Sequence, residues 1–126
     1  MPNRERVAAL IALVEEGMLI DALHEFYAED AQSQDNQDPP LQGRARQIAN
    51  AQHLLRSVRG LRVRAADWML DGDRTRIRWV YEFTGHDGRR HRQEELAQQR
   101  WRGDRIVEEH TQYDPARSAA VVLQVA

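Results

Sequence analysis

Apolar residues at helical spacing predict three helices in the first half of the chain. The first would begin after Asn3, which can cap it, and stop at Gly17. A short second helix follows at residues 20–27, and a third would run from Gly43 to Gly60. The predicted inward stripes are Val7, Leu10, Ile11, Val14 and Met18 in the first helix, Ile20, Leu23, Phe26 and Tyr27 in the second, and Ile48, Ala51, Leu55 and Val58 in the third.

The apolar period then changes to two, which predicts strands. A short strand over Ala28–Asp35 precedes a loop that ends at Pro39-Pro40. From Leu61 the alternation predicts four antiparallel strands with turns at 71–73, 86–88 and 103–104, and a change of parity at Ala65-Ala66 predicts a bulge. Because helices and strands are segregated, the fold class is α+β: a cone-shaped barrel of three helices against a strongly curved, mainly antiparallel sheet.

Length and composition limit the classes of protein that fit. The 126 residues predict one domain over 1–115 and an apolar tail over 116–126, which would form an extra strand, a dimer contact or a frayed end. The chain has no cysteine, which excludes disulfides, a thiolate nucleophile and cysteine metal sites. No apolar run is long enough for a membrane span, and the charged start lacks a signal-peptide core, so we expect a cytoplasmic protein without a membrane partner.

The basic residues are all arginine and are unevenly distributed. Residues 1–42 contain two arginines and nine acidic residues, whereas the other 16 arginines lie in residues 43–126. Such a bias is compatible with a nucleic-acid surface. It also fits a solvated outer face, since the arginines alternate with apolar residues along the predicted strands. The second interpretation is favoured, so no nucleic-acid partner is expected.

Several segments together resemble the SnoaL-like branch of the nuclear-transport-factor-2-like superfamily, which also contains the ketosteroid isomerases and polyketide cyclases. The segments are Phe26–Ala31, Gly43-Arg44, and Arg100–Glu109 followed by Tyr113-Asp114-Pro115. Their order and spacing extend the resemblance over residues 4–115. The resemblance implies a deep apolar pocket for a small hydrophobic molecule, no cofactor, and a homodimer that packs through the sheet.

The resemblance also implies where a catalytic base would lie. Ketosteroid isomerases use a carboxylate on the first strand, and the matching position is Asp35. Burial in an apolar cone would raise the pKa of that carboxyl towards neutral pH. The tyrosine and the protonated acid that stabilise the enolate in that family do not carry over, because their positions fall near Leu10 and Ala97. The alternative for Asp35 is a loop residue that caps a turn.

Strand parity suggests a second group of polar residues in the cavity. On the strand that contains Ala97, the residues that share its face are Gln93, Glu95, Gln99 and Trp101. On the last strand, the residues on the same face would be Glu109, Thr111 and Tyr113. Glu95 and Glu109 would then lie on neighbouring strands, where two carboxylates raise one another's pKa. The alternative is that either glutamate faces outward or pairs with an arginine.

Aromatic residues supply the remaining candidates. Trp79, Tyr81 and Phe83, with Trp101, would line a pocket for a flat apolar ligand or form the core around it. The five histidines show no metal-ligand spacing, so no metal site is expected. The chain also lacks a phosphate-binding glycine loop and a serine-nucleophile motif.

Two functional hypotheses remain. The first is a cofactor-independent isomerase, cyclase or dehydratase that acts on a hydrophobic, carbonyl-bearing molecule. Asp35 would be its base, and Tyr113, Tyr81 or a protonated Glu95 would hold the oxygen. In this hypothesis Trp79, Tyr81, Phe83, Gln99, Trp101 and Glu109 contact the ligand. The second is a non-catalytic ligand-binding or dimerisation module. Convergence of Asp35, Glu95 and Glu109 on one cavity favours the first.

Overall fold

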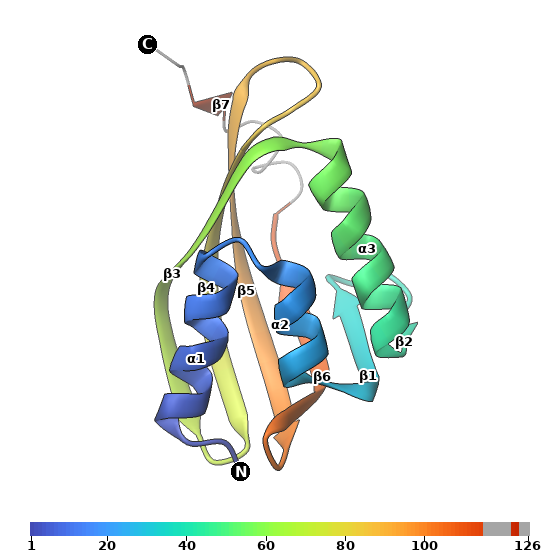
Figure 1. The fold of residues 1–126 in the computed structure, drawn as a ribbon, viewed down its shortest axis with the longest axis vertical. Coiled ribbons are helices and arrows are strands. Elements are labelled where there is room, and N and C mark those ends of the chain that lie inside the picture. The colour runs from blue at the N-terminus through green and yellow to red at the C-terminus, as the bar shows by residue number, and fades with distance from the viewer. Residues whose placement is uncertain (115–121, 124–126) are drawn as a thin grey trace.

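Three helices cover one face of a curved, mostly antiparallel sheet (Figure 1). The structure is a computed structural model that describes residues 1–114 and the strand at 122–123. The α+β fold class is confirmed. The elements are α1 (Arg4–Glu15), α2 (Leu19–Phe26), β1 (Tyr27–Asp35), β2 (Leu41–Gln42), α3 (Arg44–Ser57), β3 (Arg59–Asp71), β4 (Arg74–Thr84), β5 (Arg90–Arg102), β6 (Arg105–Gln112) and β7 (Val122–Leu123).

The sheet has the strand order β2-β1-β6-β5-β4-β3, and β7 pairs with β5. The pair β1–β6 is parallel, and the other pairs are antiparallel. Because β2 and β3 stand at opposite ends of the order, the sheet curves without closing. Of the predicted tail over 116–126, only β7 is described, and the rest lies outside the described residues.

The turns and the bulge of the long hairpins set the register between neighbouring strands. The β3–β4 register shifts between Ala65 and Asp67, so the predicted bulge is confirmed. Gly72 and Gly103 have φ angles of 62° and 64° in two-residue turns, a backbone conformation that glycine adopts without a steric penalty. Side chains on β4 and on most of β5 alternate between the helix-covered face and the outer face, and the β5–β6 register shifts once, between Arg100 and Trp101.

Helix α1 packs its predicted stripe against the sheet, except for the last residue of that stripe. The Asn3 side chain accepts a hydrogen bond from the Arg6 backbone N–H at 2.8 Å and caps the helix. Met18 is 44% exposed, because α1 ends at Glu15 and the chain turns at Gly17. Among the described residues, none of the helices is long and apolar enough to cross a bilayer.

Helix α3 presents a face that only partly matches the predicted one, because Ala51 lines the pocket as expected but Leu55 does not point inward. Leu55 was expected to point inward but is 38% exposed, whereas Gln47 is only 7% exposed. The prediction followed the apolar residues of this helix. In the structure the helix is turned so that a partly polar stripe faces the sheet. The amide side chains of Gln47 and Asn50 therefore lie over the concave side of the sheet.

Exposed arginines occupy the outer face of the sheet. Arg76 and Arg78 on β4 are exposed, on the opposite face from buried Ile77 and Trp79. Arg100 pairs with Glu108 across β5 and β6 at 2.7 Å. This distribution agrees with a solvated, ion-paired face, in which each exposed pair contributes little to stability.

The core depends on fully buried aliphatic residues such as Ile106, which has no exposed surface. Replacing Ile106 with alanine should lower the free energy of unfolding by about 2–5 kcal/mol, because the removed methyl groups leave a cavity. Urea denaturation measures this change. The control Met69→Ala, at a side chain that is 55% exposed, should stay within about 0.5 kcal/mol of the wild type. An equal loss in both variants would contradict this description of the core.

Candidate functional site

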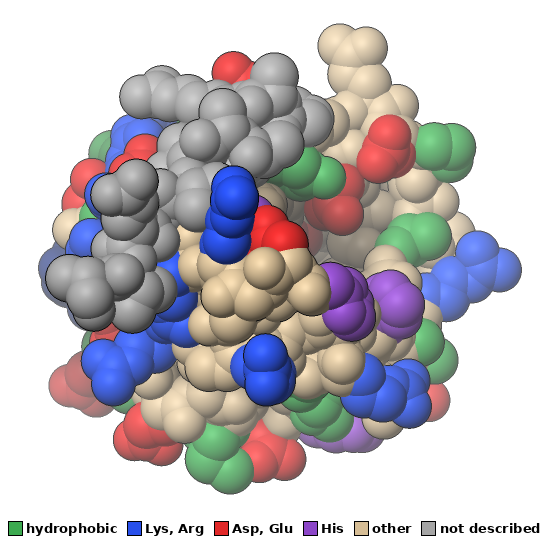
Figure 2. All heavy atoms as spheres, turned by 90° about the horizontal axis from the view of Figure 1, so that it is seen from above, with side chains coloured by type: hydrophobic (Ala, Val, Ile, Leu, Met, Phe, Trp, Pro, Cys, Tyr) green, Lys and Arg blue, Asp and Glu red, His purple; other side chains and the backbone are tan. Residues whose placement is uncertain are grey.

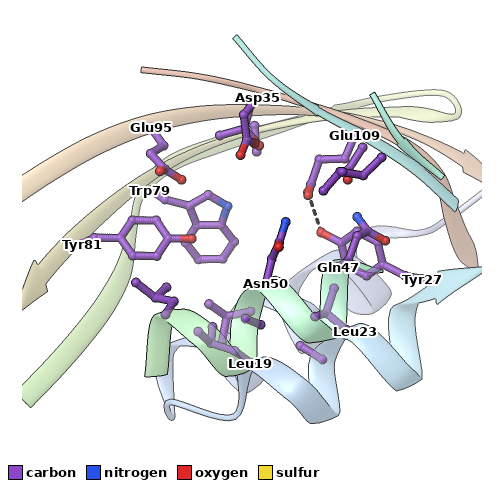
Figure 3. Close-up of a pocket in the computed structure, with 18 of the residues that line it drawn as sticks. Leu19, Leu23, Tyr27, Asp35, Gln47, Asn50, Trp79, Tyr81, Glu95 and Glu109 are labelled. Atoms are coloured by element: carbon purple, nitrogen blue, oxygen red, sulfur yellow. Dashed lines mark hydrogen bonds between the residues drawn. The ribbon is translucent and has the colours of Figure 1, made fainter. Parts of the chain in front are cut away.

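A cavity of about 570 Å³ lies between the helices and the concave face of the sheet. Figure 2 views the molecule from one end, where acidic side chains border a hollow. The aliphatic part of the wall comes mainly from the helices, and the acids and aromatic rings come mainly from the strands (Figure 3). The lining includes Leu10, Val14, Leu19, Ala22, Leu23, Tyr27, Asp35, Asp38, Gln47, Asn50, Leu54, Trp79, Tyr81, Glu95, Ala97, Glu109 and Thr111.

Three carboxylates converge on this pocket from three strands. Asp35 ends β1, Glu95 lies on β5 and Glu109 lies on β6. Their meeting follows from the register, because Asp35 pairs with Thr111, two residues beyond Glu109, and Thr111 pairs with Ala97, two residues beyond Glu95. Among the described residues, none of the three acids forms an ion pair with an arginine.

Glu109 is the most firmly held of the three acids. Its Oε2 accepts hydrogen bonds from the Tyr27 hydroxyl at 2.5 Å and from Gln99 Nε2 at 2.6 Å (Figure 3 shows the first). Burial raises the pKa of Glu109 above its ordinary value, while these two hydrogen bonds act in the opposite direction. Both bonds end on Oε2, which leaves Oε1 to interact with a ligand.

A buried chain of hydrogen bonds behind the pocket fixes the direction of the Gln99 amide. The Trp101 indole donates to the Thr75 hydroxyl at 2.8 Å, and that hydroxyl donates to Gln99 Oε1 at 2.7 Å. An indole N–H can only donate, which leaves the Thr75 proton to be donated to the amide oxygen. The Gln99 NH₂ group therefore points at Glu109, whose Oε2 is held as an acceptor.

Glu95 lies at the other end of the pocket, beside Trp79 and Tyr81 (Figure 3). Burial, with a further contribution from the charge of Asp35, raises the pKa of Glu95 to about 7. A hydrogen bond from Gln93 Nε2 at 2.6 Å opposes the shift. Glu95 can therefore both accept and release a proton near neutral pH.

Asp35 lines the pocket at an exposed position, and Tyr113 lies outside its lining. Asp35 is exposed, and its pKa is raised by partial burial and by the charge of Asp38, with His110 acting in the opposite direction. Burial and the charges of Asp35 and Glu95 raise the pKa of Tyr113. The Tyr113 backbone N–H donates to Asn36 Oδ1 at 2.9 Å, but Tyr113 does not line the described pocket.

Three other predicted ligand contacts lie behind or beside the described pocket. The Phe83 ring stacks on His91 with the ring centroids 5.4 Å apart. Trp101 is 2% exposed and belongs to the core, and Gln99 acts through Glu109. Trp79 and Tyr81 line the pocket.

Four polar residues that line the pocket were not predicted from the sequence, namely Ser33, Asp38, Gln47 and Asn50, and the polar role of Tyr27 was not predicted either. Gln47 and Asn50 line the pocket from α3, and Tyr27 was assigned only to an inward stripe. One signal was available, because residues 47, 50, 51 and 54 follow a helical period. The predicted face, chosen for apolarity alone, skipped its two amides.

Comparison with protein families gives one match. A family model described as a SnoaL-like domain matches residues 7–109, which is most of the chain. No curated protein matches the chain.

Solved structures with the same fold cover nearly the whole chain. A ketosteroid isomerase-like protein from Catenulispora acidiphila, in complex with trimethylamine, has a TM-score of 0.78 at 20% identity and covers 95% of this chain and 93% of its own. A proposed polyketide cyclase from Xanthomonas campestris has a TM-score of 0.76 at 22% identity, with 92% and 96% covered. A proposed SnoaL-like polyketide cyclase from Mesorhizobium loti has a TM-score of 0.74 at 20% identity, with 88% and 98% covered. At these identities the likeness shows the fold.

The hydrogen-bond chain behind Glu109 can be tested at Thr75, which is 4% exposed. Thr75→Val keeps the side-chain shape but leaves the Trp101 indole and the Gln99 amide oxygen without this partner. The free energy of unfolding should fall by roughly 3 kcal/mol, since each buried polar group without a partner costs about 1–3 kcal/mol. Thr75→Ser, which keeps the hydroxyl, should lose only about 1 kcal/mol in urea denaturation. Equal losses in both variants would show that the hydroxyl contributes nothing.

The raised pKa of Glu95 predicts how stability changes with pH. Between the ordinary value of 4.5 and about 7, the folded protein binds more protons than the unfolded chain. The stabilisation from the protonated group is therefore complete below pH 4.5 and is lost as pH rises towards 7. Glu95→Gln should remove this loss. As the pH rises from acidic to mildly alkaline, the free energy of unfolding of the variant should therefore increase relative to that of the wild type by on the order of 3 kcal/mol.

Urea denaturation at several pH values measures this effect. The matched control is Glu94→Gln on the neighbouring residue, whose side chain is 54% exposed and pairs with Arg92. Its pH dependence should follow that of the wild type. If Glu95→Gln also follows the wild type, Glu95 does not titrate with a raised pKa.

Proposed function

The chain belongs to the SnoaL-like domain family, and from this premise we propose that its pocket binds a small hydrophobic, carbonyl-bearing molecule and moves a proton on it without a cofactor. The proton transfer would make the protein an isomerase, a cyclase or a dehydratase. The observation that carries the proposal is Glu95, an acid with a pKa of about 7 in the wall of a cavity whose helix side is mainly aliphatic. A general base works best when its pKa lies near the working pH.

The proposed step is a proton abstraction beside the carbonyl group. The Glu95 carboxylate takes a proton from the adjacent carbon, and the electron pair of the broken C–H bond moves towards the carbonyl oxygen to form an enolate. Glu95 then returns the proton to the same carbon or to a conjugated one. Asp35, which is exposed, would act on Glu95 by charge rather than as the base.

Tyr81 is the best-supported donor for the enolate oxygen. Burial and the nearby charges of Glu95 and Glu109 raise its pKa well above the ordinary value, so the hydroxyl keeps its proton. Tyr81 also lines the pocket on the side of Glu95 (Figure 3). Tyr27 is less suitable, because its hydroxyl already donates to Glu109.

A non-catalytic binding module is the second candidate, and one observation favours it. Ala97 and Leu10 line the pocket near the positions where ketosteroid isomerases carry their oxygen-stabilising groups. Loss of one such donor can reduce a rate by about 10²–10³-fold. A pocket that binds a ligand without converting it would be consistent with the absence of these oxygen-stabilising groups.

Hydrogen–deuterium exchange separates the two candidates. With α-tetralone as a flat hydrophobic ketone, the wild-type protein in D₂O should speed exchange at the carbon beside the carbonyl, as mass spectrometry measures. Glu95→Gln should reduce the protein-dependent rate by about 10²–10⁴-fold, the usual contribution of a general base. The wild-type rate should rise with pH through about 7, as Glu95 loses its proton.

Glu94→Gln is again the control and should keep the wild-type rate, since Glu94 is exposed and does not line the pocket. Binding of the ketone is measured in parallel by calorimetry. Binding without faster exchange would contradict the enzymatic proposal and support the binding module.

A further inference from the structure

The polar side chains of the pocket mainly offer hydrogen-bond acceptors. Asp35, Glu95 and Glu109 are carboxyl groups in its wall. Two donors near Glu109, the Tyr27 hydroxyl and the Gln99 amide, are already bonded to its Oε2. A ligand group that lies against Glu109 therefore has to bring a hydrogen-bond donor of its own, whereas the Tyr81 hydroxyl stays available at the other end of the pocket.

Gln47 provides an independent observation that points to a ligand. This residue on α3 is 7% exposed and lines the pocket. Its Oε1 is buried and accepts no hydrogen bond from the part of the chain that the structure describes. A buried acceptor without a partner costs about 1–3 kcal/mol. A donor on a bound ligand would remove this penalty.

The charge of the wall adds a second requirement. Four acidic residues line the pocket, namely the three carboxyl groups above and Asp38, while no arginine or histidine among the described residues does. The raised pKa values of Glu95 and Glu109 have burial as their first cause, with mutual repulsion of the acids as a further one. A positive charge among these groups would favour their ionised forms and be held by them.

The aromatic and aliphatic lining limits the kind of cation. Trp79 and Tyr81 line the end opposite Gln47 and Glu109 (Figure 3), and leucines from α1, α2 and α3 cover the helix side. The cavity of about 570 Å³ is large enough for a small organic molecule. Aromatic rings attract organic cations, and the apolar wall binds a hydrocarbon body.

We propose that the ligand of this pocket is a hydrophobic amine in its protonated form, with the ammonium group between Glu109 and Gln47 and the hydrocarbon body towards Trp79 and Tyr81. The ammonium N–H groups donate to Glu109 Oε1 and to Gln47 Oε1. This inference rests on the proposed function in one respect, namely that this pocket is the substrate site. It adds that the substrate is positively charged. The carbonyl group of such a molecule would lie at the Glu95 end.

Matched probes test the charge requirement directly. Cyclohexylmethylamine, cyclohexylmethanol and cyclohexanecarboxylate have similar bodies and carry a cationic, a neutral and an anionic head. Calorimetry at a pH of about 8, where alkylamines are still protonated, measures their affinities. The amine should bind at least about tenfold more tightly than the alcohol, because charge-assisted hydrogen bonds are roughly twice as strong as neutral ones. The carboxylate should bind most weakly.

Two variants locate the ammonium group. Glu109→Gln keeps an oxygen for Tyr27 and Gln99 but removes the charge, and Gln47→Leu removes the buried acceptor. Both should reduce the preference for amine over alcohol to less than about threefold while the alcohol still binds. The control is Glu108→Gln, an adjacent residue on the outer face that pairs with Arg100. This control should keep the full preference.

The outcomes separate this inference from the proposed function. Binding of the alcohol or of α-tetralone as tightly as the amine would overturn the amine inference and leave proton transfer in place. A tenfold preference for the amine, with exchange that does not depend on Glu95, would support the inference and overturn the proposed function. Absence of binding by all these probes would overturn both. An unchanged preference in Glu109→Gln and Gln47→Leu would also overturn the inference.

Discussion

A buried chain of hydrogen bonds that begins at the Trp101 indole orders the polar interior of the protein. The indole donates to the Thr75 hydroxyl, which donates to the Gln99 oxygen, and the Gln99 NH₂ group donates to Glu109. The Tyr27 hydroxyl completes the arrangement from the other side. A carboxyl group that would otherwise be costly to bury is thus held in one orientation, with one oxygen engaged by the protein.

The acidic residues of the pocket have different surroundings. Among the described residues, Glu109 has two internal donors, whereas Glu95 has the Gln93 amide as its one donor and lies beside Trp79 and Tyr81. Asp35 is exposed and influences both by its charge. Similar groups therefore have different properties because of their surroundings, which is the condition under which one acid can react while another binds.

The sequence predicts the fold well, because the fold depends on patterns that persist over many residues. The stripe of α1, the bulge at Ala65-Ala66 and the glycine turns all follow from local rules. The strand parity that makes Glu95 and Glu109 candidates is of the same kind. The inward face of α3 was predicted correctly at Ala51 and wrongly at Leu55, because the helix buries Gln47 in place of that leucine. Whether the Gln47 oxygen finds a partner within the described part of the chain depends on atomic positions that no sequence pattern specifies.

The parallel pairing of β1 with β6 has a consequence for how the protein folds. Tyr27 and Glu109 are 82 residues apart in the chain, and the strands that carry them meet directly. The pocket therefore cannot form from a local hairpin, and closing such a long loop is slow compared with the formation of the β3–β4 or β5–β6 ribbon. During synthesis the helices and β1 emerge first, but β1 cannot pair with β6 until nearly the whole domain has been synthesised. The cavity is thus among the last parts of the molecule to be completed.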